Sequence, residues 1–440
     1  MGLATFKGGI HPYEGKELSE SKSVQVLQPK GEMVFPLSQH IGAPAKPLVA
    51  AGDQVLVGQK IGEPGGFISA YVISSVSGSV KTIEPRMVAN GSMVPSIIVE
   101  NDGKYQTVEG FGADRDPKSL SKDEIRNIVK EAGIVGLGGA GFPTHVKLTP
   151  KDETKIDTII VNAAECEPYL TSDYRMMLEE SESIVKGLNI MLQLFDNAKG
   201  VIGIETNKPE AIKKMTELVK DEPRITVCPL KTKYPQGGER SLIYAVTGRK
   251  INSTMLPADA GCIVNNVDTA ISIYYAVAKS TPLIRRIITV TGDAIANPQN
   301  YEVRTGTNYQ ELLEASGGFK TEPEKVISGG PMMGQALFNL DIPVTKTSSA
   351  LTCLSTDEVA MNAPTACIRC GRCVTVCPSR VIPQMMMDAA KSSDMERFLK
   401  LDGMECCECG CCTFICPAKI PLTQAFKEMR KAVVASRKKA

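Results

Sequence analysis

The spacing of hydrophobic and polar positions changes along the chain and divides it into regions. Within residues 31–84, short runs rich in β-branched residues alternate with Gly and Asp, most clearly at 49–61 and 74–80. Runs of this length between turn residues are typical of strands in a small all-β unit. We therefore predict an all-β domain in residues 1–115, ending in a polar linker at 110–118.

Helical and strand periodicities alternate in the next region, which we place at residues 116–284. Ser121 and Glu124 form a capping box, which predicts a helix that runs to about Ala132. After a glycine-rich loop, strands are predicted at 156–162, 201–205 and 224–230, and helices at 172–195, 209–219 and 239–246. This alternation predicts a parallel sheet with helices on both faces.

A β pattern returns for a third region at residues 285–343. Strands at 287–291 and 326–328 flank a helix at 309–315, which predicts a small α+β domain. A polar bridge at 345–358 leads into the last region, 344–440, whose end from residue 419 is helical and basic.

Composition and charge narrow the function classes. The chain has 440 residues, of which 42% are hydrophobic and 22% charged, so it can build several cores. A formal net charge of +1 gives no support to a nucleic-acid partner. No apolar run is long enough to span a bilayer, and the N-terminus lacks a signal-peptide pattern. We expect a reducing cytoplasmic location and only peripheral membrane contact.

Eight of the fourteen cysteines form two copies of the spacing C-x2-C-x2-C-x3-C-P. This spacing matches the bacterial run that binds a [4Fe–4S] cluster, in which the fourth Cys ligates the neighbouring cluster. One predicted cluster has the ligands Cys367, Cys370, Cys373 and Cys416. The other has Cys406, Cys409, Cys412 and Cys377. Structural zinc favours separated Cys pairs and disulfides need an oxidising compartment, so both alternatives fit the spacing poorly.

The glycine-rich loop at 133–141 is a candidate phosphate site. Backbone N–H groups can close on an anion where no Cβ intervenes, although a set of tight turns is the alternative explanation. The loop follows a helix and precedes a strand, which is the reverse of the Rossmann fingerprint. Polar segments at 162–168, 236–240 and 264–269 stand beside predicted strand ends, where open α/β sheets bind ligands.

These segments resemble the flavin-bearing subunit of respiratory complex I. Its motifs G-x-G-G-A-G-F-P-T-x-x-K, N-A-D-E-x-E-P, G-E-E-T and N-N-V-E-T correspond to residues 138–147, 162–168, 238–241 and 265–269. The resemblance implies non-covalent FMN and a site for NADH/NAD+. The implied cofactor-binding residues are Gly136, Gly138, Gly139, Gly141, Phe142, Lys147, Asn162, Glu165, Gly238, Glu239, Asn265, Asn266 and Thr269.

The same resemblance implies roles for individual residues. Phe142 would stack on the adenine of NADH, and Glu165 and Glu167 would be catalytic, with Glu167 near the nicotinamide. The chain departs from the family pattern at Ala164 and Cys166, which replace Asp and Ser. It also lacks the W-x-F segment that follows the Lys, so fewer aromatic contacts to the adenine are expected.

The whole chain resembles the C subunit of Rnf complexes. The G-D-x-V-x-x-G-Q-x-I segment at 52–61 and S-G-x-V at 77–80 resemble a barrel-sandwich carrier domain without its modifiable Lys, and 285–343 resembles a β-grasp (SLBB-like) domain. The implied fold class is multidomain α/β and α+β: barrel-sandwich, Rossmann-like FMN/NADH domain, β-grasp, and a ferredoxin-like module with two [4Fe–4S] clusters.

The Rnf resemblance implies a function. Such a subunit exchanges electrons between NADH and, indirectly, ferredoxin within a membrane-bound complex that translocates Na+ or H+. Its partners would be the membrane and ferredoxin-like subunits of the complex, at the cytoplasmic side of the membrane. NADH delivers an electron pair whereas each cluster carries one electron, so the flavin has to divide the pair.

Three alternatives remain open at the level of sequence. A corrin (cobalamin) reductase has a related composition but a different domain order, and a diaphorase subunit usually joins other cluster modules to its flavin domain. The third alternative is an electron-relay or docking subunit without a nucleotide site. The basic end from residue 419 either faces an acidic lipid or partner surface or is a solvated terminus.

Overall fold

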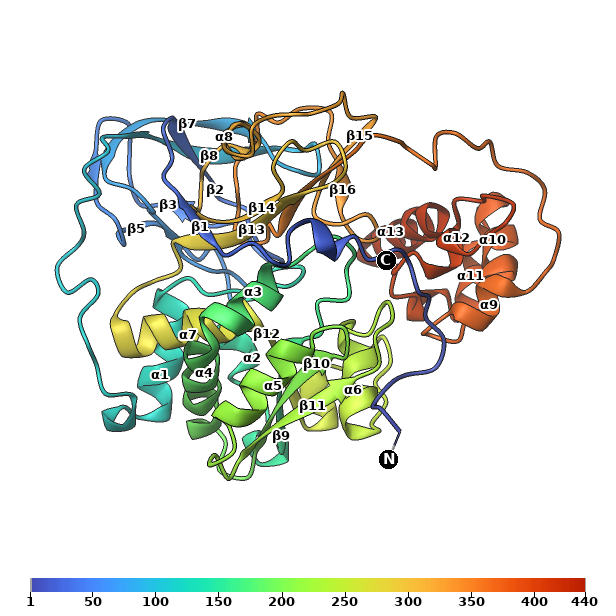
Figure 1. The fold of residues 1–440 in the computed structure, drawn as a ribbon, viewed down its shortest axis with the longest axis horizontal. Coiled ribbons are helices and arrows are strands. Elements are labelled where there is room, and N and C mark those ends of the chain that lie inside the picture. Colours follow the sequence, from blue (N-terminus) through green and yellow to red (C-terminus); the bar gives the residue numbers. More distant parts are fainter. Residues whose placement is uncertain (1, 440) are drawn as a thin grey trace.

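The computed structural model describes the backbone of residues 2–439 and the side chains of residues 2–437. The parallel sheet, β9 (Thr158–Ala163) to β12 (Cys262–Asn266), lies with its helices in the lower part of the view, and the other sheets lie above it (Figure 1). A helical module lies to one side. Within residues 2–439, no helix combines the length and the apolar character that a bilayer span needs.

Two antiparallel sheets form the N-terminal β unit. The first contains β2 (Glu32–Pro36), β8 (Met93–Asn101), β7 (Gly78–Met87) and β4 (Gln54–Val55), and the second contains β3 (Lys46–Pro47), β5 (Lys60–Glu63) and β6 (Val72–Ile73). Alternate residues such as Met33, Phe35 and Ile97 are fully buried in the core of this unit. The predicted all-β unit is confirmed.

The first residues do not belong to these sheets. Ala4 makes a bridge with Leu230, and Ile10 makes an antiparallel bridge with Tyr234. Gly9 then donates its backbone N–H to the carbonyl of Val376, at 2.8 Å. The N-terminal segment, residues 2–24, therefore links the parallel-sheet unit to the helical module.

The central unit contains the predicted parallel sheet. Its order is β11 (Ile225–Leu230), β10 (Lys199–Glu205), β9 (Thr158–Ala163) and β12 (Cys262–Asn266), and every neighbouring pair is parallel. Ile159 and Val161 of β9 belong to the larger core, together with residues of α4 (Ser181–Gln193) and α7 (Val267–Lys279). Ile160 belongs to a second core with Leu242 of α6 (Glu239–Thr247). Both faces are covered, which explains the continuous apolar run of β9.

The helix predicted at 172–195 is two helices, so that prediction was wrong. α3 (Ser172–Glu179) ends before Glu180, whose φ of −118° and ψ of 26° are not helical, and α4 begins at Ser181. The carboxylate of Glu180 accepts hydrogen bonds from Ser183 Oγ at 2.6 Å and from the Tyr275 hydroxyl at 3.1 Å. The second bond is a tertiary contact, which local periodicity does not reveal.

A six-stranded mixed sheet forms the third unit. Its order is β1 (Gln25–Leu27), β14 (Gln299–Arg304), β13 (Arg285–Thr291), β17 (Ala350–Leu354), β15 (Lys325–Ser328) and β16 (Gln335–Ala336), with α8 (Tyr309–Ala315) packed against it. Two of these strands, β1 and β17, come from outside the predicted α+β region. β17 lies within the segment that is predicted to be a polar bridge. The sequence pattern misses this strand because Ser and Thr flank it on both sides, although its Leu351 and Cys353 are fully buried.

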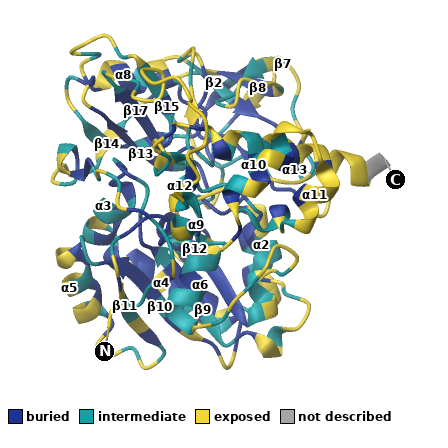
Figure 2. Cartoon of the chain, turned by 90° about the vertical axis from the view of Figure 1, so that its right-hand side faces the viewer, coloured by how far each residue is buried: buried dark blue, intermediate teal, exposed yellow. Residues whose placement is uncertain are grey.

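The C-terminal module consists of short helices. They are α9 (Arg372–Val376), α10 (Pro383–Lys391), α11 (Met395–Lys400), α12 (Cys411–Phe414) and α13 (Leu422–Lys439). The helical end predicted from residue 419 is confirmed as α13, whose inner side is buried and outer side exposed (Figure 2). Phe426 and Val433 are each only 1% exposed, so α13 belongs to the core of this module.

Candidate functional site

The glycine-rich loop runs between α1 (Lys122–Glu131) and α2 (Thr144–Lys147). Gly136 N donates to the carbonyl of Phe142 at 2.9 Å, and Leu137 N donates to Thr269 Oγ1 at 3.0 Å. A Cβ at Gly138 would come within 2.9 Å of the Cβ of Asn266, so only Gly fits there. Gly139 is exposed and faces open space, which leaves its backbone accessible to a ligand.

Lys147 brings a positive charge beneath this loop. Its Nζ donates to the carbonyl of Val264 at 3.1 Å and lies 3.3 Å from the place that a Cβ on Gly136 would occupy. Burial lowers the pKa of Lys147, and the carboxylate of Glu239 opposes that shift. A cation in such surroundings is available to a phosphate or to a polar ring atom of a cofactor.

The amide side chains at the ends of β9 and β12 are brought together by the parallel sheet. Asn162 Nδ2 donates to the Gly237 carbonyl at 2.8 Å. Asn266 caps α7 by accepting from Asp268 N at 2.9 Å, and its Nδ2 donates to Asp173 Oδ2 at 2.7 Å. These contacts position the loops around the predicted flavin-binding residues.

Asn265 supplies a test of whether a ligand fits here. The residue is only 1% exposed, and among the described atoms its Oδ1 has no hydrogen-bond partner. Gln236, in the neighbouring loop, has a buried amide as well, and its Nε2 is likewise without a partner among those atoms. An unsatisfied buried polar atom costs about 1–3 kcal/mol, so a bound polar group would stabilise this part of the site. The donors and acceptors present fit FMN.

Glu165 is engaged in holding the loop. It has a left-handed φ of 48°, and its carboxylate accepts from Asp173 N at 2.6 Å and Tyr174 N at 3.3 Å, at the start of α3. Lys16 Nζ lies 3.9 Å from Glu165 Oε2. Burial raises the pKa of Glu165, while Lys16 opposes the shift. These contacts indicate a positioning role for this predicted catalytic residue.

Glu167 reaches the third unit. Its Oε1 accepts from the backbone N–H groups of Met332 at 2.7 Å and Met333 at 3.1 Å. A Cβ on Gly330 would lie 2.3 Å from Glu167 Cγ, so the turn after β15 approaches closely only because it contains Gly. Burial raises the pKa of Glu167 to about 7. The predicted catalytic carboxyl therefore connects the flavin loops to this turn.

Lys16 is a site residue that the sequence did not reveal. Its Nζ donates to three carbonyls of one loop, those of Glu165 at 2.9 Å, Glu167 at 3.1 Å and Leu170 at 2.6 Å. Only 6% of the residue is exposed. A single Lys in a polar N-terminal segment carries no local signal for such a role, because the contact joins residues about 150 positions apart.

Six cysteines line one cavity in the C-terminal module. Cys407 and Cys411 lie outside the repeated spacing, and the other four are Cys377 from the first run and Cys406, Cys409 and Cys412 from the second. These four are the crossed set that the spacing predicts for the second cluster. Within residues 2–439, no three Cys, His, Asp or Glu converge as they would around a single metal ion. Cysteines around a cavity fit a [4Fe–4S] cluster better, since each thiolate binds a different iron.

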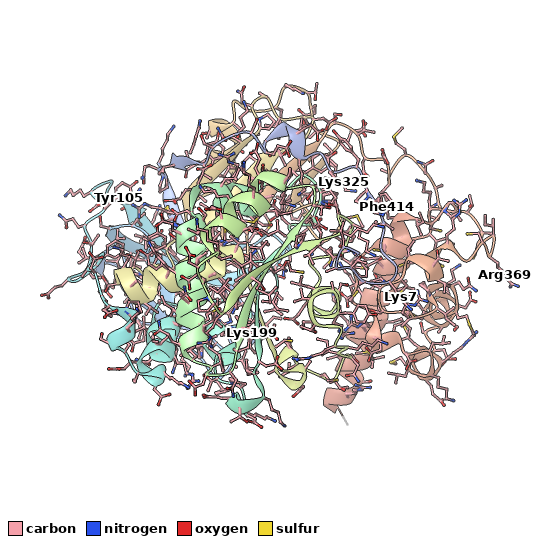
Figure 3. All side chains as sticks on the ribbon, turned by 60° about the horizontal axis from the view of Figure 1, so that its bottom comes forward. Lys7, Tyr105, Lys199, Lys325, Arg369 and Phe414 are labelled. Atoms are coloured by element: carbon pink, nitrogen blue, oxygen red, sulfur yellow. The ribbon has the colours of Figure 1, made fainter. Side chains whose placement is uncertain are left out.

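The other four cysteines of the two runs are more exposed. Cys367 and Cys370 are exposed, whereas Cys373 and Cys416 are half-buried and pack against the module core. The two runs share local geometry: Arg369 N and Glu408 N each lie 3.4 Å from the sulfur of the Cys two residues earlier. Arg369 marks the outer edge of the molecule (Figure 3). In the crossed set that lines the cavity, Cys377 and Cys412 are buried while Cys406 and Cys409 are half-buried. We call this crossed set the buried set, and the other four, of which two are exposed, the outer set.

The buried set faces the flavin-loop side of the central unit. The Tyr234 hydroxyl donates to the carbonyl of Cys409 at 2.8 Å, and Arg240 Nη1 pairs with Glu405 Oε2 at 3.0 Å. Met332 Cε would lie 3.2 Å from a Cβ on Gly410. Tyr234 and Arg240 flank the loop that contains Gly238 and Glu239, so the buried cysteines lie next to a predicted flavin segment.

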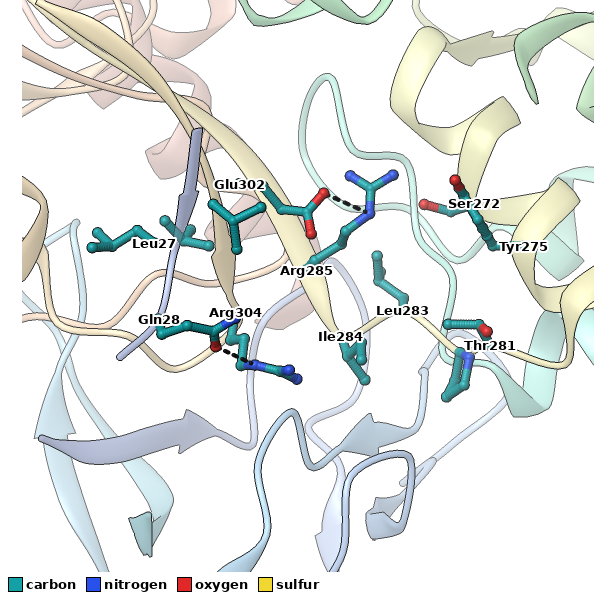
Figure 4. A pocket seen from close by; sticks show the side chains of 13 residues that line it. Leu27, Gln28, Ser272, Tyr275, Thr281, Leu283, Ile284, Arg285, Glu302 and Arg304 are labelled. Carbon is teal, nitrogen blue, oxygen red and sulfur yellow. Dashed lines mark hydrogen bonds and ion pairs between the residues drawn. The ribbon is translucent and has the colours of Figure 1, made fainter. Parts of the chain in front are cut away.

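A separate cavity of about 270 Å³ lies between β1, α7 and the β13–β14 pair (Figure 4). Arg285 Nε lies 3.5 Å from Glu302 Oε2, and Arg304 Nε donates to Gln28 at 3.2 Å. Both guanidinium groups in the lining are therefore already engaged, and none of the predicted cofactor residues lines this cavity.

Four family models match the chain. Their descriptions are "RnfC Barrel sandwich hybrid domain" for residues 4–104, "Nuo51 FMN-binding domain" for 129–275, "SLBB domain" for 287–336 and "4Fe-4S binding domain" for 363–382. These matches confirm that the chain contains the predicted types of domain: barrel-sandwich, FMN-binding, SLBB-like and iron–sulfur.

Curated relatives match nearly the whole chain. The C subunit of the Na+-translocating ferredoxin:NAD+ oxidoreductase complex of Acetobacterium woodii is 43% identical, over 99% of this chain and 98% of its own length. The C subunit of the proton-translocating complex of Clostridium ljungdahlii is 45% identical, over 87% of this chain and 84% of its own length. A solved NAD+-reducing [NiFe]-hydrogenase in the H2-reduced state matches with a TM-score of 0.49 and 16% identity, over 73% of this chain and 62% of that one.

Proposed function

Because this chain belongs to the family of C subunits of ion-translocating ferredoxin:NAD+ oxidoreductase complexes, we propose that it exchanges electrons between NADH and the iron–sulfur partners of such a complex. The observation that carries the proposal is the position of the buried cysteine set directly beside a flavin segment. FMN and [4Fe–4S] clusters are its cofactors, as the matching family models indicate.

The proposed domains follow the sequence boundaries with two additions. They are the barrel-sandwich in 1–115, the Rossmann-like FMN/NADH domain in 116–284, the β-grasp domain in 285–343 and the two-cluster module in 344–440. The strand β17 supports assigning 350–354 to the β-grasp domain as well. The contacts of Ala4 and Ile10 support treating the N-terminal segment as a strap across the other units.

The protein groups have distinct proposed roles around the flavin. FMN supplies the chemistry that accepts two electrons with a hydride and releases them singly. The open backbone at Gly139 and the cation of Lys147 would bind the polar parts of FMN, beside Gly138, where there is no room for a Cβ. The unpaired Oδ1 of Asn265 would accept a hydrogen bond from FMN. Phe142 would contact NADH.

Glu165 and Glu167 have different proposed roles. Glu165 holds the loop against the start of α3, so it positions the site. Glu167, with a pKa raised to about 7, would set the polarity at the nicotinamide end. Each carboxyl accepts hydrogen bonds from backbone N–H groups, which fix its orientation, and Glu165 also has the Lys16 ammonium 3.9 Å away.

The order of the clusters follows from burial. The set of Cys377, Cys406, Cys409 and Cys412 adjoins the central unit, so its cluster would exchange electrons with the flavin first. The set that includes exposed Cys367 and Cys370 would then exchange single electrons with a partner protein. The reverse flow, toward NAD+, uses the same route.

The partners and location are proposed from the relatives. The A. woodii protein belongs to a complex named for Na+ translocation, and the C. ljungdahlii protein belongs to one named for proton translocation. We place this chain at the cytoplasmic side of the membrane, attached to membrane and ferredoxin-like subunits and exchanging electrons with ferredoxin through them. The absence of a spanning helix in residues 2–439 agrees with peripheral attachment.

Anaerobic stopped-flow mixing of the FMN-loaded chain with NADH or NADPH tests this function. We expect NADH to bleach the flavin faster than NADPH, because Glu165 and Glu167 make the nucleotide side acidic. Reduction of the clusters should follow flavin bleaching. Equal rates with both nucleotides would overturn the preference. If neither nucleotide reduces the flavin, the docking or relay role without a nucleotide site is the better description.

A further inference from the structure

Tyr234 stands where three parts of the chain meet. Its backbone N–H and carbonyl pair with Ile10 of the N-terminal segment, at 2.9 and 2.8 Å. Its hydroxyl donates to the carbonyl of Cys409 at 2.8 Å. Two residues later the chain enters the flavin loop, where Gly237 N contacts Cys166 Sγ at 3.2 Å. One residue thus joins the flavin loop, the N-terminal segment and the buried cysteine set.

The surroundings make this hydrogen bond a fixed feature. Tyr234 is 2% exposed and shares an apolar cluster with Ile10 and Cys411, against which Met332 and Cys409 pack. An ordinary phenol is protonated across the physiological range, so the Tyr234 hydroxyl remains a donor. Water has little access to replace the bond.

We propose that Tyr234 is a positioning residue that tunes the flavin-side cluster. The proposal rests on the proposed function, because it takes Cys409 as a ligand of that cluster. A hydroxyl that donates to the Cys409 carbonyl points its positive end toward the cysteine loop, and it fixes the loop against the flavin segment. A donor dipole in a buried site favours the more negative, reduced form of a cluster.

The proposal predicts the sign of a potential shift. Tyr234→Phe removes the donor, leaves the Cys409 carbonyl unsatisfied and should make the reduced cluster less favourable. We expect this bond to favour the reduced cluster over the oxidised one by about fivefold, which is the size of one ordinary net hydrogen bond. For a one-electron couple this lowers the midpoint potential by about 40 mV.

The experiment is a potentiometric titration of the anaerobically reconstituted full chain, followed by electron paramagnetic resonance. The signal of the outer cluster is identified by its loss in Cys370→Ala. We expect Tyr234→Phe to lower the potential of the Cys406-containing cluster and to leave the outer cluster unchanged. The control, Tyr275→Phe, removes a hydroxyl that contacts Glu180 at 3.1 Å and should leave both potentials unchanged.

A second substitution should shift the midpoint potential of the flavin-side cluster in the opposite direction. Fluorotyrosine at position 234 keeps the shape of the side chain and is a stronger donor, so it should raise the same potential. It also provides the test if Tyr234→Phe fails to retain its iron. An unchanged potential in these variants, or an equal shift of both clusters, would overturn the proposal. The titration needs no nucleotide, so a failure of the proposed NADH activity would leave its result unaffected.

Discussion

At the scale of single residues, the site depends on a few buried polar groups whose partners lie far away in sequence. Lys147 is anchored by a carbonyl of β12, and Glu167 by two amides of the third unit. Lys16 donates to carbonyls of the loop that contains Glu167. Glu167 and Lys16 act through contacts between units, and Lys147 acts through a long-range contact within the central unit. Substitution of these residues should therefore affect cofactor binding and stability more than local helix or strand formation.

Lys147→Ala should weaken FMN binding. The substitution removes a charged donor beneath the glycine-rich loop, and such hydrogen bonds contribute about 1.5–3 kcal/mol each. The dissociation constant should therefore rise by about tenfold or more in a fluorescence titration of the apo chain with FMN. Lys151→Ala, an exposed Lys shortly after α2, is the matched control. An FMN affinity unchanged in Lys147→Ala would exclude Lys147 from the flavin site.

Glu167→Gln should alter how stability depends on pH. Burial raises the pKa of Glu167 from 4.5 to about 7, so between these values the folded chain holds a proton that the unfolded chain has released. This contribution to stability is fully present below about pH 4.5 and is lost as the pH rises to about 7, which lowers the free energy of unfolding by about 3 kcal/mol.

The comparison uses urea unfolding of the apo chain across this pH window, followed by circular dichroism. Glu167→Gln should lack the part of the decline that Glu167 causes, because Gln does not ionise. Glu322→Gln, at an exposed position, should follow the wild-type curve. Parallel curves for Glu167→Gln and the wild type would contradict the assignment of the pH dependence to Glu167.

At the scale of elements, the duplicated Cys run is the clearest unit. Gly371 and Gly410 both adopt a left-handed conformation immediately before a short helix, with φ of 73° and 82°. The fourth Cys of the first run lies in a cavity with the second run. Which cysteines share a cluster therefore depends on how the two runs pack together. The spacing within one run does not determine this packing, and the crossed sets are expected only because other two-cluster proteins have them.

Cys377→Ala should damage the flavin-side cluster and spare the outer one. The chain reconstituted without oxygen should hold about eight iron atoms, and the variant about four. Cys407→Ala, which removes a Cys outside the repeated spacing, should retain about eight. Iron analysis with electron paramagnetic resonance checks both variants. If Cys377→Ala instead abolishes the signal of the Cys367-containing cluster, each run binds its own cluster and the crossed assignment is wrong.

The packing of the C-terminal helix α13 changes the interpretation of its basic residues. Arg430 pairs with Glu408 at 2.7 Å and donates to the carbonyl of Cys406, so it supports the cluster loop. Lys431 and Arg437 are exposed and free to meet an acidic lipid or partner surface, whereas Lys438 and Lys439 lie outside the described side chains. Truncation within α13 would damage the module core, so membrane docking is better tested by substitution.

At the scale of the whole molecule, the cofactors would form a line from the central unit outward to the Cys367 loop. That end is basic: Arg369, Arg372 and Arg380 are exposed, and no Asp or Glu occurs in residues 359–387. None of the three guanidinium groups forms an ion pair within the described part of the chain. Exposed Ile368 adds apolar surface. Such a surface fits an acidic one-electron partner.

Reversing these charges should weaken partner reduction selectively. In the assembled complex, Arg369→Glu with Arg372→Glu should slow NADH-dependent reduction of the partner by about tenfold at low salt, and the difference should shrink at high salt. NADH–ferricyanide activity should persist, since NADH and FMN bind elsewhere. The control is the double variant Lys213→Glu with Lys220→Glu, at exposed positions of the central unit. Equal losses in both double variants would argue against docking at the Cys367 end.

Much of the architecture was predictable because its signals are local. The capping box at Ser121, the β–α alternation and the two Cys runs depend on residues a few positions apart, and the structure contains the elements they predict. The motifs around the flavin were recognisable for the same reason. Spacing also predicts that a Cys of one run ligates the cluster of the other run. Cys377 lies in a cavity with cysteines of the second run, and its ligation stays a prediction.

Tertiary structure decided what depends on contacts between distant segments. The helix break at Glu180, the strand β17 and the position of the N-terminal segment are set by partners in distant segments of the chain. So are the burial of Lys16 and the bond from Tyr234 to Cys409. Local periodicity encodes the propensity of a segment. The pairing of buried polar groups depends on which distant chain segments supply their hydrogen-bond partners, because a buried donor or acceptor must be satisfied wherever the fold brings a partner.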